Sequence, residues 1–153
     1  MKEYEFHLST PVKFARAGGE AGETTLIVFK EPMYRHAGAT AALKGHYTQA
    51  MFQASERASR QGIEVKNEQE TEPTAEDRAA FINLMIRMDG TLSEAIIGAF
   101  IRLVKMPGIA AVDGDIQLSE VHLASIPYED IERMTVSFLA NFIERSSSTV
   151  PTA

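Results

Sequence analysis

Histidine is the side chain in this sequence best suited to bind a metal ion or to transfer a proton near neutral pH. The chain has four histidines in four different contexts: His7, His36, His46 and His122. No two of them lie three or four positions apart, the helical spacing that brings two imidazoles to one metal ion. The sequence therefore predicts no metal site. An enzyme that uses His46 or His122 with nearby acids stays open as an alternative.

The segment Asp113-Gly114-Asp115-Ile116-Gln117 begins like a calcium-binding loop. Such a loop needs a glycine at its sixth position and a bidentate acid at its twelfth position. This sequence has Leu118 and Ala124 at those two positions. The segment Asp113-Gly114-Asp115 is therefore better interpreted as a turn.

Paired carboxylates form the third candidate, because two acids held together can share acid–base work. Glu76-Asp77 and Glu129-Asp130 each stand at the expected start of a helix, where acids interact favourably with the helix dipole. No serine lies in a Gly-x-Ser-x-Gly elbow, and the glycines of residues 17–22 do not form a phosphate-binding loop. The sequence therefore predicts a protein that is not an enzyme and that uses no cofactor.

The first element expected from the sequence is a β-hairpin over residues 3–30. Tyr4, Phe6 and Leu8 alternate with polar residues, as in a strand with one buried face. Pro11 is expected to cut the ladder short or to place this strand at a sheet edge, because proline has no amide to donate. A glycine-rich turn and the β-branched and aromatic run 24–30 complete the hairpin. A lone hairpin is marginal in water, so it must pack on helices or on another chain.

Helical spacing of apolar residues predicts helices over about 34–56, 74–89, 92–106 and 126–145. We expect residues 57–72 to form a flexible linker and residues 146–153 to be a disordered tail. Residues 116–123 fit either a short strand or a short helix. Together these elements predict a single domain over residues 1–145 of the α+β class, mainly α. In it, an N-terminal β-hairpin is followed by about four helices packed as a small bundle.

Composition limits the classes of partner. The 153 residues are 44% hydrophobic, which is enough for one core, and the absence of cysteine fits a reducing compartment. A net charge of -6 repels a phosphate backbone, so nucleic acid is not expected as a partner. No run approaches the roughly 18 apolar residues of a membrane helix. The start of the chain lacks the apolar core of a signal peptide.

Three stretches carry a resemblance to a known family. They are the opening Tyr-Glu-Phe-His-Leu-Ser-Thr-Pro-Val of residues 4–12, the second strand running into Glu31-Pro32, and residues 126–142 with their Phe138-Leu139 pair. In these stretches and in the order of its elements, the chain resembles the tail assembly chaperones of tailed bacteriophages.

The resemblance implies a protein of the host cytoplasm that binds the tape measure protein, keeps that long helical chain soluble and recruits tail tube subunits. Such a chaperone is absent from the finished virion. The family is often also made as a longer, frameshifted product, which would place the extension after the tail 146–153. The alternative is a small structural component of the virion, of the tail terminator or connector type.

A protein of this kind binds its partners through surface side chains. The candidate contact residues are Tyr4, Phe6, Leu8, Leu26, Val28, Phe138 and Phe142. Packing in the core is the competing interpretation, and it is favoured for the aromatic residues and Leu8 because large apolar side chains are most often buried. Self-association is a further expectation, since a second copy would also cover the hairpin.

Overall fold

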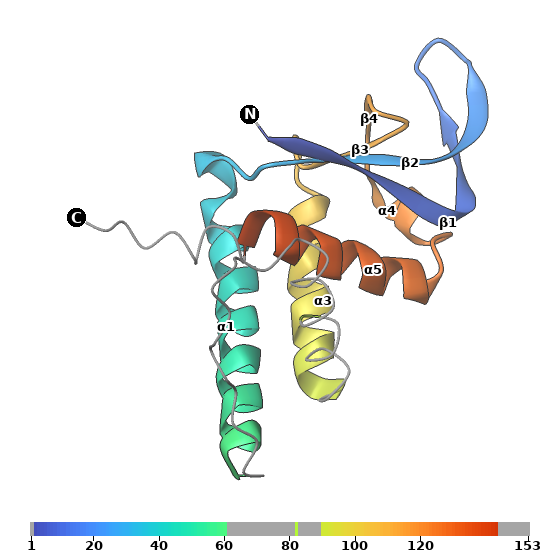
Figure 1. The fold of residues 1–153 in the computed structure, drawn as a ribbon. Helices are drawn as coiled ribbons and strands as arrows, with labels where there is room; N and C mark the ends of the chain where they lie inside the picture. Colours follow the sequence, from blue (N-terminus) through green and yellow to red (C-terminus); the bar gives the residue numbers. More distant parts are fainter. Residues whose placement is uncertain (1, 61–81, 83–89, 144–153) are drawn as a thin grey trace.

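The computed structural model describes residues 2–60, 82 and 90–143. Figure 1 shows the elements in chain order. They are β1 (Glu3–Ala15), β2 (Ala21–Lys30), the 3₁₀ helix η1 (Tyr34–His36), α1 (Ala37–Arg60), α3 (Gly90–Val104), β3 (Ala110–Val112), β4 (Ile116–Gln117), α4 (Glu120–Leu123), α5 (Tyr128–Phe138) and the π-helical turn η2 (Leu139–Ile143).

The strands form one antiparallel sheet in the order β1-β2-β3-β4. β1 and β2 make the expected N-terminal hairpin, which is confirmed. Their register shifts between His7 and Val12, the stretch that contains Pro11. Proline cannot donate to a ladder, so the break falls where the sequence requires one. In the strand order, β1 lies at one edge of the sheet.

An aromatic cluster fills the space between the sheet and the helices. Phe29 of β2 is fully buried at its centre. Ring centroids around Phe29 lie at 5.3 Å for Tyr4, 6.2 Å for Phe6, 6.2 Å for Phe100 and 5.9 Å for Phe138. Such ring pairs contribute about 0.5–1.5 kcal/mol each beyond the area they bury. The cluster therefore ties the hairpin to α3 and α5.

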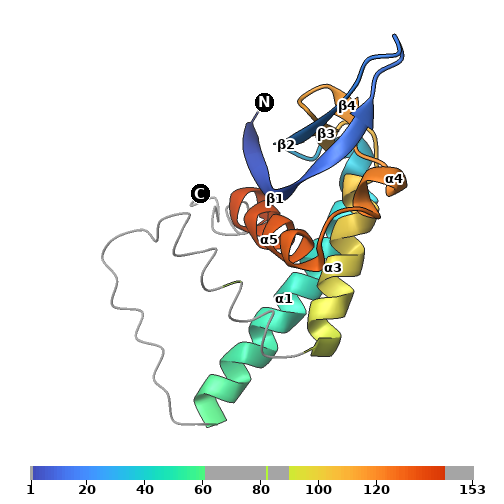
Figure 2. The ribbon, with the colours of Figure 1, turned by 90° about the vertical axis from the view of Figure 1, so that its right-hand side faces the viewer.

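The helices α1, α3 and α5 lie on one side of the sheet, as both ribbon views show (Figures 1 and 2). α5 passes beneath the hairpin, while α1 and α3 run side by side away from it. Ile96, Phe100 and Leu103, spaced three or four positions apart on α3, are fully buried. Among the described residues, no helix covers the other face of the sheet.

The prediction of a mainly α protein with a helical bundle is wrong. β3 and β4 extend the hairpin to a sheet of four strands, and the helices cover one face of it. β3 has three residues and β4 has two, which is too short for a period of two to appear in the sequence. The two alanines of β3 also have low strand preference, so only pairing with β2 makes this segment a strand.

The described helices differ from the expected ones mainly at their ends. η1 and α1 together cover 34–60, so α1 continues into the start of the expected linker 57–72. α3 and the pair α5–η2 occupy the places of the helices expected over 92–106 and 126–145. The helix expected over 74–89, apart from Ile82, and the tail 146–153 lie outside the described residues.

Candidate protein-binding surface of the sheet

Most of the candidate contact residues belong to the core. Phe6, Leu8, Phe138 and Phe142 are buried, and Tyr4 packs against the same cluster. Burial raises the pKa of Tyr4, and the neighbouring Ser137 partly offsets the rise. The four buried side chains therefore stabilise the fold and offer no free surface to a partner, and Tyr4 is partly buried in the same cluster.

Leu26 and Val28 lie on the opposite face, because side chains of a strand alternate between the two faces. The register places residues of this face side by side across the strands. We call this surface the outer face, which consists of the row Glu5, Val28, Ala111 and Gln117 and the adjacent pair His7 and Leu26.

The middle of the outer face is aliphatic. Leu26, Val28 and Ala111 are half-buried, yet none of them belongs to the core cluster or packs against it. An antiparallel sheet with one solvated face normally carries polar residues there. This strip departs from that pattern and is a candidate contact surface.

The free edge of β1 is the second part of the candidate surface. The Glu31 amide donates to the Lys2 carbonyl at 3.0 Å, which fixes the even-numbered residues of β1 as the ones bonded to β2. In an antiparallel ladder the residues between them direct both backbone groups away from the partner strand. Glu3, Glu5 and His7 therefore present N–H and C=O groups at the edge.

α5 closes one end of this edge. Asp130, which is 1% exposed, accepts hydrogen bonds from the Ser9 amide at 3.1 Å and from the Ser9 hydroxyl at 2.7 Å. Arg133 donates to Asp130 at 2.8 Å and to the His7 carbonyl at 3.4 Å, and its guanidinium lies 4.9 Å from the centre of the Phe6 ring. The open edge is therefore the stretch Glu3–His7.

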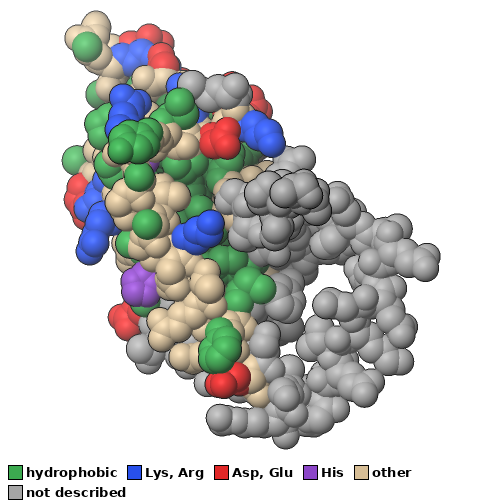
Figure 3. All heavy atoms as spheres, turned by 90° about the vertical axis from the view of Figure 1, so that its left-hand side faces the viewer, with side chains coloured by type: hydrophobic (Ala, Val, Ile, Leu, Met, Phe, Trp, Pro, Cys, Tyr) green, Lys and Arg blue, Asp and Glu red, His purple; other side chains and the backbone are tan. Residues whose placement is uncertain are grey.

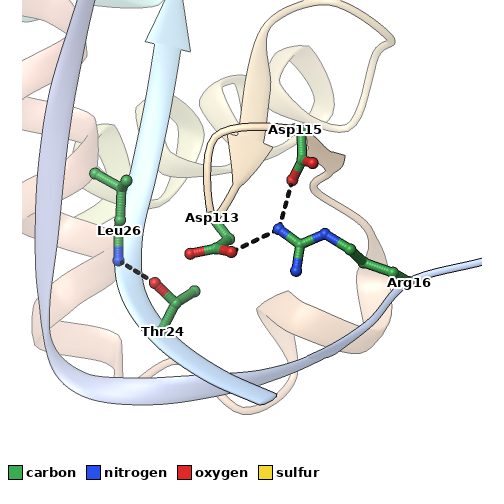
Figure 4. A network of polar contacts seen from close by, with 5 residues as sticks. All are labelled: Arg16, Thr24, Leu26, Asp113 and Asp115. Atoms are coloured by element: carbon green, nitrogen blue, oxygen red, sulfur yellow. Dashed lines mark hydrogen bonds and ion pairs between the residues drawn. The ribbon is translucent and has the colours of Figure 1, made fainter. Parts of the chain in front are cut away.

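A charged contact fixes the far corner of the sheet (Figure 4). Arg16 Nη2 lies 2.6 Å from Asp113 Oδ2 and 2.9 Å from Asp115 Oδ1. Arg16 and a hydrogen bond from Thr24 hold the pKa of Asp113 below its usual range. Asp113 and Gly114 have positive φ angles of 57° and 92°, as a tight turn requires. The segment once compared with a calcium loop is thus a turn whose two carboxylates face an arginine.

Two histidines, His36 and His122, form hydrogen bonds with backbone groups of the fold. His36 is buried, with Nδ1 accepting from the Met33 amide at 2.9 Å and Nε2 at 2.8 Å from the Pro107 carbonyl. His122 Nδ1 accepts from the Ser119 amide at 3.1 Å at the start of α4, and burial lowers the pKa of His122. The described residues contain no group of three or more potential metal-ligating side chains.

No family model, curated protein or solved structure matches this chain. Within the described ranges, no helix is both long enough and apolar enough to cross a membrane.

Sequence reasoning missed the residues that define the open edge. Asp130 was expected only to complement the dipole of its helix, but its carboxylate is buried and bonded to a strand far away in the sequence. Nothing local to Asp130 indicates this contact. Glu5 could have indicated the edge from the sequence, because a charged residue on an edge strand is a common protection against unwanted pairing.

Proposed function

We propose that this protein is a non-catalytic, protein-binding chaperone of phage tail assembly. It acts in the host cytoplasm, binds the tape measure protein and recruits tail tube subunits. The observation that supports the proposal is the aliphatic strip of the outer face, formed by Leu26, Val28 and Ala111 and covered by no described helix.

The strip suits an amphipathic partner. A helix with apolar residues every three or four positions buries that stripe against a flat aliphatic surface, and burial contributes roughly 25 cal/mol per Å² of apolar area. The tape measure protein, as a long helical chain, offers such stripes repeatedly. Binding here leaves the helical side of the sheet, and hence the core, undisturbed.

Large exposed side chains offer further contacts. Tyr34 is 95% exposed, Phe52 63% and Tyr128 60%. Figure 3 views the molecule from the side on which α1 lies, where hydrophobic side chains stand among scattered charges and are densest toward the sheet. Aromatic side chains are enriched where proteins meet.

Co-expression with the product of the long reading frame beside its gene tests the proposal. We expect the long protein to become soluble and to co-purify with this chain. A variant carrying Leu26→Thr and Val28→Thr keeps strand preference but removes apolar surface, and we expect it to recover at least about tenfold less of the long protein. Val121→Thr, at a 79% exposed site on α4, is the matched control and should behave as wild type.

Two results would overturn the proposal. One is a long protein that stays insoluble and unbound when this chain is abundant. The other is the presence of this chain in purified particles, detected by mass spectrometry, because an assembly chaperone is absent from them. The second result favours a structural virion component. If the double variant and wild type recover equal amounts of the long protein, the outer face is not the contact surface.

A further inference from the structure

We propose that the open edge of β1, Glu3–His7, accepts an extended basic segment of a partner protein as a fifth strand of the sheet. This binding mode goes beyond the proposed function, because it concerns a backbone edge rather than the aliphatic strip. It identifies the partner segment by its conformation and its charge.

The backbone supplies the first part of the case. Glu3, Glu5 and His7 direct their N–H groups toward the free side, as do the carbonyls of Glu3 and Glu5, while the His7 carbonyl already accepts from Arg133. Among the described residues, none contributes a hydrogen bond to the free groups of Glu3 and Glu5. Such a row pairs readily with an incoming extended chain.

The second part is the limit that α5 sets. Asp130 occupies the amide of Ser9, and Pro11 follows in the stretch where the register shifts. An added strand therefore cannot continue past His7 without displacing a buried carboxylate. The site is short and has a defined end, which fixes where an incoming segment stops.

Charge selects the occupant. Glu3 lies opposite Lys30, but Glu5 lies opposite Val28 and has no cation across from it on β2. A lysine or arginine on the added strand, placed beside Glu5 on the outer face, would supply the missing charge. Opposite charges at facing positions stabilise a strand pair by roughly 0.2–1 kcal/mol, and like charges destabilise it.

The same charges disfavour a second copy of this chain as the occupant. Antiparallel pairing of two such edges matches residues that direct their backbone groups outward. The register that uses the whole open edge places Glu5 opposite the Glu5 of the other copy. Like carboxylates then face each other at the centre of the pair. The edge is thus protected against self-association and receptive to a basic strand.

The test uses the full chain, labelled with ¹⁵N, and a peptide of about seven residues in which lysine alternates with valine. A peptide with glutamate in place of lysine is the control. We expect the basic peptide to slow hydrogen exchange at the amides of Glu3, Glu5 and His7 at least about tenfold. The amides of Phe6 and Ser9, already bonded to β2 and to Asp130, should change little.

Variants at Glu5 distinguish the contribution of its charge from that of its backbone amide. Glu5→Lys should lose the basic peptide and gain the acidic one, whereas Glu20→Lys, at an exposed site in the β1–β2 turn, should keep wild-type preference. Glu5→Pro removes an amide that β2 does not use, so it should abolish protection while leaving the ladder intact. If Glu5→Pro fails to fold, the charge reversal decides.

Equal protection by both peptides, or none by either, would overturn the inference, as would dimers of this chain joined through β1. None of these results bears on the recovery of the long protein, which tests the outer face instead. Failure of the one proposal is therefore distinguishable from failure of the other.

Discussion

His122 shows how a single side chain makes stability depend on pH. Its Nδ1 atom accepts a hydrogen bond from Ser119, and burial lowers the pKa of the folded-state imidazole. The unfolded chain therefore binds a proton at a higher pH than the folded chain does. The stability contribution of neutral His122 is complete above the ordinary histidine pKa of about 6.5 and is lost as the pH falls from there toward the folded-state value.

We predict that His122→Asn weakens this pH dependence. Asparagine offers an acceptor near the position of Nδ1 but does not titrate. Urea denaturation of both proteins at several pH values between about 5 and 8 should give a shallower loss of unfolding free energy in the variant. Parallel curves for the two proteins would contradict the lowered pKa of His122.

At the scale of elements, Asp130 joins α5 to β1. Its buried carboxylate accepts two hydrogen bonds from Ser9 and one from Arg133. Hydrogen bonds to charged groups contribute about 1.5–3 kcal/mol each when a partner is lost from a buried site. The tie also ends the free stretch of the edge, so one side chain serves both the packing of α5 and the shape of the candidate surface.

We predict that Asp130→Ala lowers the unfolding free energy by about 1–3 kcal/mol, because the amide and hydroxyl of Ser9 and the guanidinium of Arg133 lose their common acceptor. Hydrogen exchange at the Ser9 amide should also accelerate. Glu129→Gln, a neutralised acid at the exposed neighbouring position, is the control and should change stability by less than about 0.5 kcal/mol. Equal losses of unfolding free energy in the two variants would indicate that Asp130 stabilises the fold through the helix dipole rather than through its hydrogen bonds to Ser9.

At the scale of the whole molecule, the sequence predicted those parts whose pattern is local and long. The alternation of Tyr4, Phe6 and Leu8 identified the hairpin, and the stripe of Ile96, Phe100 and neighbouring residues identified α3. β3 could not be found in this way, since a strand of three residues exists only through pairing. Residues 116–123, left open between a short strand and a short helix, contain both β4 and α4.

The candidate surface was predictable only in part. Leu26 and Val28 were among the predicted contact residues, but the sequence alone does not say which face of a hairpin the helices cover. The tie between Ser9 and Asp130 joins residues 121 positions apart, and no local pattern reports a contact at that separation. The open edge depends on that tie, so it too required the structure.

The sheet has one buried face and one outer face, and neighbouring residues of β2 should report this difference. Ile27 is fully buried, while Val28 is half-buried and lies outside the core cluster. Ile27→Thr removes apolar contacts and buries a hydroxyl, so we expect it to lower the unfolding free energy by about 2–4 kcal/mol.

Val28→Thr places the same hydroxyl where water reaches it, and we expect a change of less than about 0.5 kcal/mol. Urea denaturation of the two single variants measures both values. A large loss at both positions would mean that another part of this chain covers the outer face. That part would then compete with any partner for the aliphatic strip, and binding of the long protein would require its displacement. A large loss at Ile27 alone keeps the outer face available.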